Sequence, residues 1–280
     1  MLNLSIEKKL HYTLRIASAM CFIGHGAWGI ITKPIWCNYF AVFGIGHELA
    51  YRIMPFLGSF DILLGIVILF YPLRAIPMWL VLWGITTAVL RPLSGEPFAE
   101  FIERAGNFGA PLVLLILSSG TRENRQGFFS TLKFNYSLDD KTLMNMELSL
   151  RIIAFLLLLG HGWLNLIEKK GLINQYSTLG FSNPYLSAHL VGVFETIAAF
   201  SVLIRPFRSV VLVLLLWKIA SELFYPQHEL FEWIERGGSY GSILALWFIL
   251  DKANYRSKYW LSANNYFNKS NNYPPANLQL

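Results

Sequence analysis

Two stretches, FIERAGNFG (residues 101–109) and WIERGGSYG (residues 233–241), decide how the chain is organised. Both follow the pattern Ile-Glu-Arg-x-Gly, then a small polar residue, an aromatic residue and glycine, and both lead into a long apolar run. Charged residues are costly within apolar helical segments, and where they occur they normally have a structural or functional role. The recurrence of this pattern predicts that the chain consists of two copies of one structural unit.

The composition is that of an integral membrane protein. The 280 residues are 54% hydrophobic and only 14% charged, whereas soluble domains carry about 25% charged residues. The apolar runs approach twenty residues, which is the length a membrane-spanning helix needs. We interpret the net charge of +6 as basic residues on cytoplasmic loops. Nucleic acid is therefore not an expected partner, and the lipid bilayer is.

Eight apolar runs can be distinguished, four in each half of the chain. They cover residues 10–31, 53–71, 75–90, 103–118, 148–167, 187–204, 209–225 and 235–250. The predicted fold class is therefore an all-α integral membrane protein, with eight transmembrane helices forming two parallel-repeat four-helix bundles. The expected organisation is a first repeat at residues 1–120, a cytoplasmic linker at 121–146, a second repeat at 147–252 and a polar, disordered tail at 253–280. A short helix is also expected in the loop at residues 33–51.

Matched residues recur through the two halves at a nearly constant offset. The pairs are Arg15 and Arg151; Gly24-His25-Gly26 and Gly160-His161-Gly162; Gly58 and Gly192; Asp61 and Glu195; Trp83 and Trp217; Glu103-Arg104 and Glu235-Arg236. Because four helices are an even number, both halves must enter the membrane in the same direction. This predicts a pseudo-two-fold axis along the membrane normal, as in parallel repeats of other membrane proteins.

Lysine and arginine set the expected orientation. If the N-terminus is cytoplasmic, most of these residues fall on inner segments, and the positive-inside rule then places both termini in the cytoplasm. We expect the location to be a bacterial inner membrane. In this orientation the ionisable residues of the helices gather in the outer half of the bilayer.

Three of these residues are the predicted catalytic groups: His161, Glu195 and Glu222. A charge inside a span costs at least about 2.5–3.5 kcal/mol, so it normally faces a partner or a water-filled cavity. The alternative for each is a structural hydrogen bond between helices. Lys218 and Glu222 have no counterparts in the first half, which favours the second half as the site of the working pocket.

A second group is predicted to bind ligand or to act as a structural clamp. It comprises His25, Asp61, Glu103, Arg104, Lys218, Glu235 and Arg236. Acids near a helix N-terminus are favoured by the helix dipole alone. Each arginine could pair with the carboxylate of the second helix of its own half, and buried ion pairs of this kind specify an arrangement of helices in some proteins. We therefore favour the clamp for the Glu-Arg stretches. No metal site is expected.

The unit with Gly-His-Gly in its first helix, an acid in its second and a Pro-x-Arg turn before its third resembles DoxX-like membrane proteins. The matching positions are Gly24, His25, Gly26 and Asp61, and Gly160, His161, Gly162 and Glu195. The chain departs from that pattern at Gly29 and Asn165, where a lysine often stands. The resemblance implies a membrane subunit of a quinone-linked oxidoreductase, such as a thiosulfate-to-quinone system, with a quinone as its cofactor.

Three functions stay open. In the first, a quinone pocket in the outer half of the bilayer uses His161 and Glu195 as proton acceptors during quinol oxidation, and a soluble or membrane-bound redox partner takes the electrons. In the second, Glu195, Glu222 and Lys218 line the path of a transporter or channel for a small solute or ion. In the third, the protein is a non-catalytic scaffold whose polar groups specify helix packing.

Overall fold

The computed structural model describes residues 4–119, 127–132, 138–223 and 230–251. The helices are α1 (Ile6–Ile30), α2 (Trp36–Ala41), α3 (His47–Phe70), α4 (Ala75–Leu93), α5 (Ala99–Glu103), α6 (Ala105–Ser119), α7 (Asp140–Leu166), α8 (Lys170–Thr178), α9 (Pro184–Ile204), α10 (Arg208–Leu223) and α11 (Leu230–Glu235). Residues 237–251 form a further helical segment. The described residues form no strand beyond an isolated bridge between Leu73 and Thr131.

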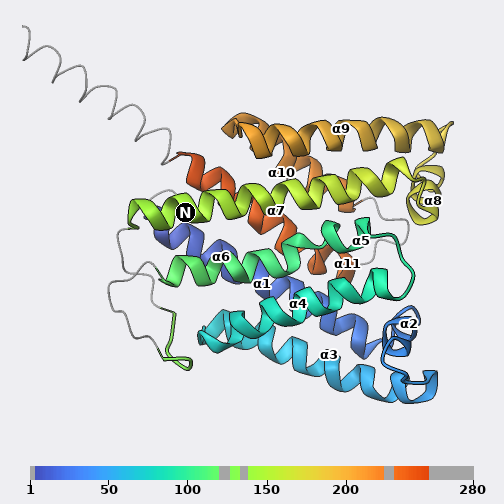
Figure 1. Cartoon of the computed structure of the whole chain (residues 1–280), viewed down its shortest axis with the longest axis horizontal. Coiled ribbons are helices and arrows are strands. Elements are labelled where there is room, and N and C mark those ends of the chain that lie inside the picture. The colour runs from blue at the N-terminus through green and yellow to red at the C-terminus, as the bar shows by residue number, and fades with distance from the viewer. Residues whose placement is uncertain (1–3, 120–126, 133–137, 224–229, 252–280) are drawn as a thin grey trace, which may run out of the picture.

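The long helices lie side by side, with α2 and α8 at one end of the bundle (Figure 1). α2 confirms the short helix expected in its loop, whereas α8 occurs in a connection where no helix was expected. α7 begins at Asp140, inside the segment assigned to the linker, because the side chain of Asp139 caps the amide of Thr142 at 2.9 Å. Buried Leu143 and Met146 then anchor this first part of α7. The tail at residues 253–280 lies outside the described residues.

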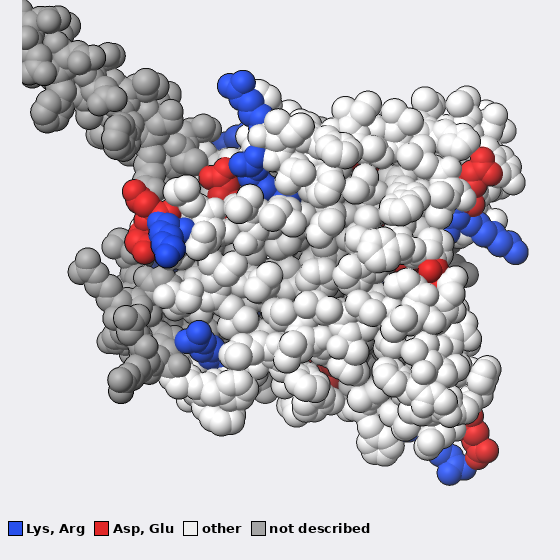
Figure 2. All heavy atoms as spheres, viewed as in Figure 1, with Lys and Arg blue, Asp and Glu red and all other residues white. Residues whose placement is uncertain are grey.

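Four helices, α3, α4, α7 and α9, are long and apolar enough to cross a membrane. Their outer surfaces are apolar as well: Phe56 and Phe70 of α3 are 77% and 82% exposed, and Ile197 of α9 is 65% exposed. Figure 2 shows charged side chains at the two ends of the molecule, with a broad uncharged belt between them on the viewed face. These features indicate an integral membrane protein. Of the other expected spans, α6 has 15 residues and α10 has 16.

The fourth apolar run of each half is interrupted at an arginine. α5 ends at Glu103 and α6 starts at Ala105, with the backbone of Arg104 outside the helical range at φ −87° and ψ 13°. The helix of the second half breaks in the same way at Arg236, between α11 and residues 237–251. The helix expected from about Glu103 thus begins at Ala105, and the short helix α5 that precedes the break was not expected. Each break turns a glutamate and an arginine into the interior of the bundle.

At the first glycine of each Gly-His-Gly stretch, the fourth helix of the opposite half packs closely against the backbone. α11 packs on α1, and α5 packs on α7. A Cβ atom on Gly24 would overlap the backbone of Glu235, and one on Gly160 would overlap the backbone of Glu103. Only glycine allows helix backbones to approach so closely. The two halves are thus interlocked rather than merely adjacent.

The second glycine of each stretch faces the second helix of its own half. A Cβ atom on Gly26 would lie 2.5 Å from the carbonyl oxygen of Gly58, and one on Gly162 would lie 3.0 Å from that of Gly192. The histidine between the two glycines is therefore held where three helices meet. Its position follows from two close backbone approaches.

An arginine near the start of the first helix of each half binds the end of the second. Arg15 Nε donates to the carbonyl of Ile68 at 3.0 Å, near the C-terminus of α3. Arg151 Nε donates to the carbonyl of Leu203 at 3.1 Å, near the C-terminus of α9. Carbonyl groups at a helix C-terminus lack partners within the helix and carry partial negative charge. These contacts fix the end of the bundle opposite to α2 and α8.

Candidate functional site

His25 on α1 forms a polar triad with residues of α3 and α4. Its Nδ1 atom lies 2.8 Å from Oδ2 of Asp61, and Trp83 Nε1 donates to the same oxygen at 3.2 Å. Asp61 is only 1% exposed. A carboxylate can only accept, so the hydrogen of the neutral imidazole lies on Nδ1 and Nε2 presents a lone pair. The triad makes Nε2 a base that Asp61 stabilises when it becomes protonated.

His161 on α7 forms a second triad of the same kind. Its Nδ1 atom lies 2.6 Å from Oε2 of Glu195, and Trp217 Nε1 donates to Oε1 of Glu195 at 2.9 Å. Glu195 is fully buried. The sequence pointed to each histidine and each acid as a site residue, whereas Trp83 and Trp217 were matched between the halves without being given a role in the site. Their recurrence at matched positions was the available signal.

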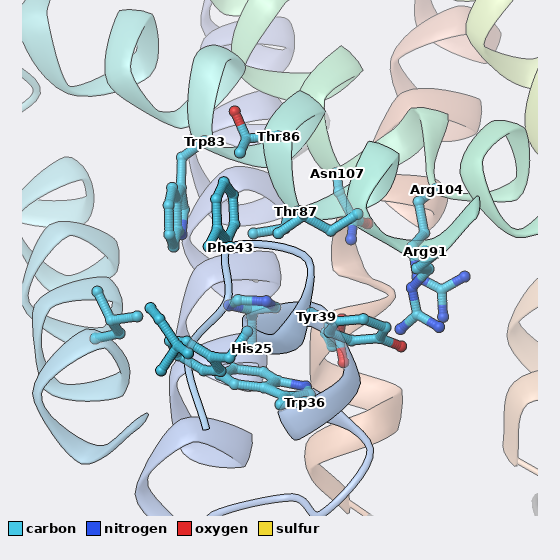
Figure 3. A pocket seen from close by; sticks show the side chains of 15 residues that line it. His25, Trp36, Tyr39, Phe43, Trp83, Thr86, Thr87, Arg91, Arg104 and Asn107 are labelled. Carbon is cyan, nitrogen blue, oxygen red and sulfur yellow. The ribbon is translucent and has the colours of Figure 1, made fainter. Parts of the chain in front are cut away.

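An aromatic cavity of about 140 Å³ lies against His25. The indole of Trp36 from α2 covers the imidazole, with ring centroids 4.6 Å apart and an angle of 30° between the planes. Figure 3 shows Trp83, Phe43 and Tyr39 placed around the same space. Sequence analysis treated residues 33–51 as a loop and did not single out these aromatic residues. Their clustering in the stretch WCNYFAVF (residues 36–43) was the signal that it did not use.

One side of the cavity opens at the surface of the bundle. Phe43, which follows α2, is 63% exposed although it lines the cavity. Thr86 on α4 lines it and is also exposed. The helices α3 and α4, which line part of the cavity, also carry exposed apolar side chains.

A second, polar space of about 830 Å³ lies at the α2 and α8 end of the bundle, and we call it the vestibule. It shares Tyr39, Arg91 and Arg104 with the cavity. Both halves of the chain line the vestibule, because Lys169 of the second half and Glu100 of the first form an ion pair within it. The aromatic cavity therefore borders both an apolar surface and a polar vestibule.

Ion pairs keep the Glu100 side chain in the vestibule ionised. Glu100 accepts from Arg104 at 2.6 Å and lies 3.3 Å from Arg91. Burial by itself would raise the pKa of Glu100, but Arg104, Lys169 and Arg91 lower it to about 2. Burial raises the pKa of Tyr39, so its hydroxyl stays a donor to Glu96, at 2.5 Å.

The Glu-Arg stretches form a clamp between the two halves. Glu103 lies 2.9 Å from Arg104 of its own half and 2.7 Å from Arg236 of the other. Arg104 pairs with Glu100 and Glu103 and not with Asp61, so the pairing expected for it is wrong. The reason is the helix break, which turns Arg104 back along its own segment. Arg236 links Glu103 to Glu222, at 2.7 and 3.7 Å.

The remaining predicted catalytic residue, Glu222, belongs to this clamp. It lies 2.6 Å from Lys218 Nζ, and both side chains are almost completely buried. In the second half, the Tyr176 hydroxyl donates to the fully buried Asn165 at 2.7 Å, and the Asn165 amide donates to the backbone carbonyl of His161 at 3.0 Å. The aromatic cavity thus lies on the first half, although sequence analysis favoured the second.

No family model, curated protein or solved structure matches the chain. Among the residues that the structure describes, no group of three or more His, Cys, Asp and Glu side chains is placed to hold a metal ion. The site must therefore be interpreted from its own geometry. That geometry combines a supported imidazole base, an aromatic wall, an apolar opening and a polar vestibule.

Proposed function

We propose that the chain binds the ring of a lipid-soluble quinone and serves as the membrane subunit of a quinone-linked redox system. The observation that carries this proposal is the His25–Asp61 pair, at 2.8 Å, facing an aromatic cavity. A base supported by a buried carboxylate is what the oxidation of a quinol requires, because that reaction releases protons. The proposal moves the reacting base from His161 to His25.

The size and walls of the cavity suit a single aromatic ring. Its volume of about 140 Å³ is close to the roughly 150 Å³ of an engineered apolar cavity that binds benzene. Trp36 and Trp83 offer ring faces and edges, and such aromatic contacts favour flat ligands. The opening at Phe43 and Thr86 would let an isoprenoid tail remain in the bilayer while the ring enters.

The proposed reaction needs a quinol and a redox partner protein that accepts its electrons. A quinol gives up two protons and two electrons and becomes a quinone. His25 Nε2 takes one hydroxyl proton, with Asp61 stabilising the resulting imidazolium, and the second hydroxyl proton passes to water in the vestibule. The electrons pass to a redox partner protein that carries a one-electron or two-electron centre. The neighbouring vestibule supplies a polar surface through which protons can leave.

The wider organisation belongs to the same proposal. We propose eight transmembrane helices as a tandem duplication of a DoxX-like unit, in an inner membrane with both termini cytoplasmic. The two His–acid–Trp triads and the two arginines at the ends of α3 and α9 support the duplication, because matched residues make matching contacts. The helices other than α3, α4, α7 and α9 would cross the bilayer packed against those four.

Transport is less well supported. At the end of the bundle opposite to the vestibule, most buried residues are apolar and form one cluster that joins both halves, with a few buried polar side chains such as His11 and Ser18 among them. The cluster includes Leu10, Leu14, Leu114, Leu150 and Leu246, each with no exposed area. A solute or ion path would need polar groups or water through this region.

Replacing His25 with alanine is expected to weaken binding of decylubiquinol at least about tenfold, because a hydrogen bond between the ring and the imidazole is lost. His161→Ala is the matched control, since it removes the histidine of the other triad. Binding is measured by quenching of tryptophan fluorescence in detergent under reducing conditions. Thermal unfolding midpoints confirm that both variants fold. A loss of affinity in His161→Ala alone would place the site in the second half and overturn the proposal.

A further inference from the structure

Glu235 reaches the aromatic cavity from the opposite half of the chain. It lies at the end of α11, which packs on α1 beside Gly24. It is only 7% exposed and lines the cavity together with His25. Within the part of the chain that the structure describes, its carboxylate makes no hydrogen bond and no ion pair.

The matched residue of the first half, Glu103, shows how unusual this is. Glu103 is held by Arg104 at 2.9 Å and by Arg236 at 2.7 Å. No hydrogen bond or ion pair of this kind holds the Glu235 side chain within the described residues. A buried carboxylate without a partner is destabilising, so its persistence at a cavity wall points to a ligand. The same motif thus serves as a clamp in one half and faces a cavity in the other.

Several of the hydrogen-bond donors that line the cavity are already engaged. Trp83 donates to Asp61 at 3.2 Å, and the Tyr39 hydroxyl donates to Glu96 at 2.5 Å. The hydroxyls of Thr86 and Thr87 donate to backbone carbonyls, at 2.9 and 3.3 Å. Arg91 and Arg104, on the side of the vestibule, are held in ion pairs. The Asn107 side-chain amide can either donate or accept a hydrogen bond.

We infer that the cavity selects the reduced, dihydroxy form of the ring, with Glu235 accepting a hydrogen bond from its second hydroxyl group while His25 Nε2 accepts from the first. The inference rests on the proposed function, which supplies the quinone ring as ligand, and adds that the ring is bound in its reduced state. A quinone carries two carbonyl oxygens that can only accept, so it would face two acceptors and bind poorly. A hydroquinone supplies one donor to each of them.

Three small rings of the same size and substitution test this selectivity. Duroquinol carries two hydroxyl groups, 2,3,5,6-tetramethylphenol carries one, and duroquinone carries none. We expect the wild-type protein to bind duroquinol more tightly than the phenol and the phenol more tightly than the quinone. Glu235→Gln is expected to weaken duroquinol binding about tenfold or more and to change phenol binding by less than about twofold.

Glu232→Gln provides the matched control, because Glu232 lies on the same short helix but pairs with Lys33 in the vestibule, at 3.1 Å. It should leave the affinities for all three rings unchanged. The thermal midpoint of Glu235→Gln should not fall, since no ion pair is lost. Equal loss of duroquinol and phenol binding in Glu235→Gln, or equal wild-type affinity for duroquinol and duroquinone, would overturn the inference alone. Failure of the wild-type protein to bind any of the three rings would overturn the proposed function as well.

Discussion

Replacing Gly160 with alanine should lower the free energy of unfolding by about 3 kcal/mol or more, at the upper end of what overpacking costs. The added methyl group would overlap the backbone nitrogen and Cα of Glu103. Backbone atoms of a packed helix cannot move aside as a flexible side chain can, so α5 would have to leave α7. For a protein of this size, the thermal midpoint in detergent should fall by on the order of 10 °C.

Gly171→Ala is the control for this prediction. Gly171 is also helical, in α8, but nothing lies within 4 Å of the position that its Cβ atom would take. Alanine should be neutral or slightly stabilising there, because it favours a helix more than glycine does. Equal midpoints for Gly160→Ala and Gly171→Ala would show that the two halves are not interlocked at this glycine.

Glu103→Gln should destabilise the protein by about 3 kcal/mol, because it removes the buried carboxylate that Arg104 and Arg236 share, and each arginine then keeps only its other glutamate partners. Glu103 is bound by Arg104 and by Arg236 of the opposite half, so the loss affects both segments. Thermal unfolding in detergent measures the effect. Glu235→Gln is the natural comparison, since the two glutamates occupy matched positions and only Glu103 makes ion pairs within the described chain. If both variants unfolded at the same temperature, the clamp role of Glu103 would be contradicted.

Much of the helix pattern could be predicted from the sequence, because apolar runs bounded by Pro, Arg and Gly mark helices by local chemistry. The sequence also held the signals for the pairing of His25 with Asp61 and of His161 with Glu195, although these acids were expected to pair with the arginines. A glycine on each side of the histidine predicts a close approach, and an intramembrane acid needs a partner. These predictions use only neighbouring helices of one half.

What lies between the halves could not be predicted in this way. The packing of α5 on α7 and of α11 on α1 depends on how two similar units dock, and the spacing of residues within each unit does not contain that information. The helix break at Arg104 follows from the same docking, because the arginine turns inward to join the clamp. For this reason Arg104 was expected to pair with Asp61, and Glu222 was expected to be catalytic.

The location of the cavity also depends on side chains that repeat imperfectly. Trp36 lies tilted over His25 at the wall of the cavity, whereas in the second half Tyr176 is hydrogen-bonded to Asn165, which donates to the backbone carbonyl of His161. Counting polar residues favoured the second half because Lys218 and Glu222 are found only there. Lys218 and Glu222 belong to the clamp, so the larger number of polar residues in the second half did not indicate a pocket there.

Photolabelling tests most directly whether the cavity beside His25 holds a quinone ring. The purified protein is illuminated with a short-chain azidoquinone, and the labelled residues are mapped by mass spectrometry, with excess decylubiquinol as competitor. Competable label is predicted on residues 36–43 and 83–91, which line the cavity. Label that decylubiquinol does not displace, spread over the exposed faces of α3 and α9, would contradict the account.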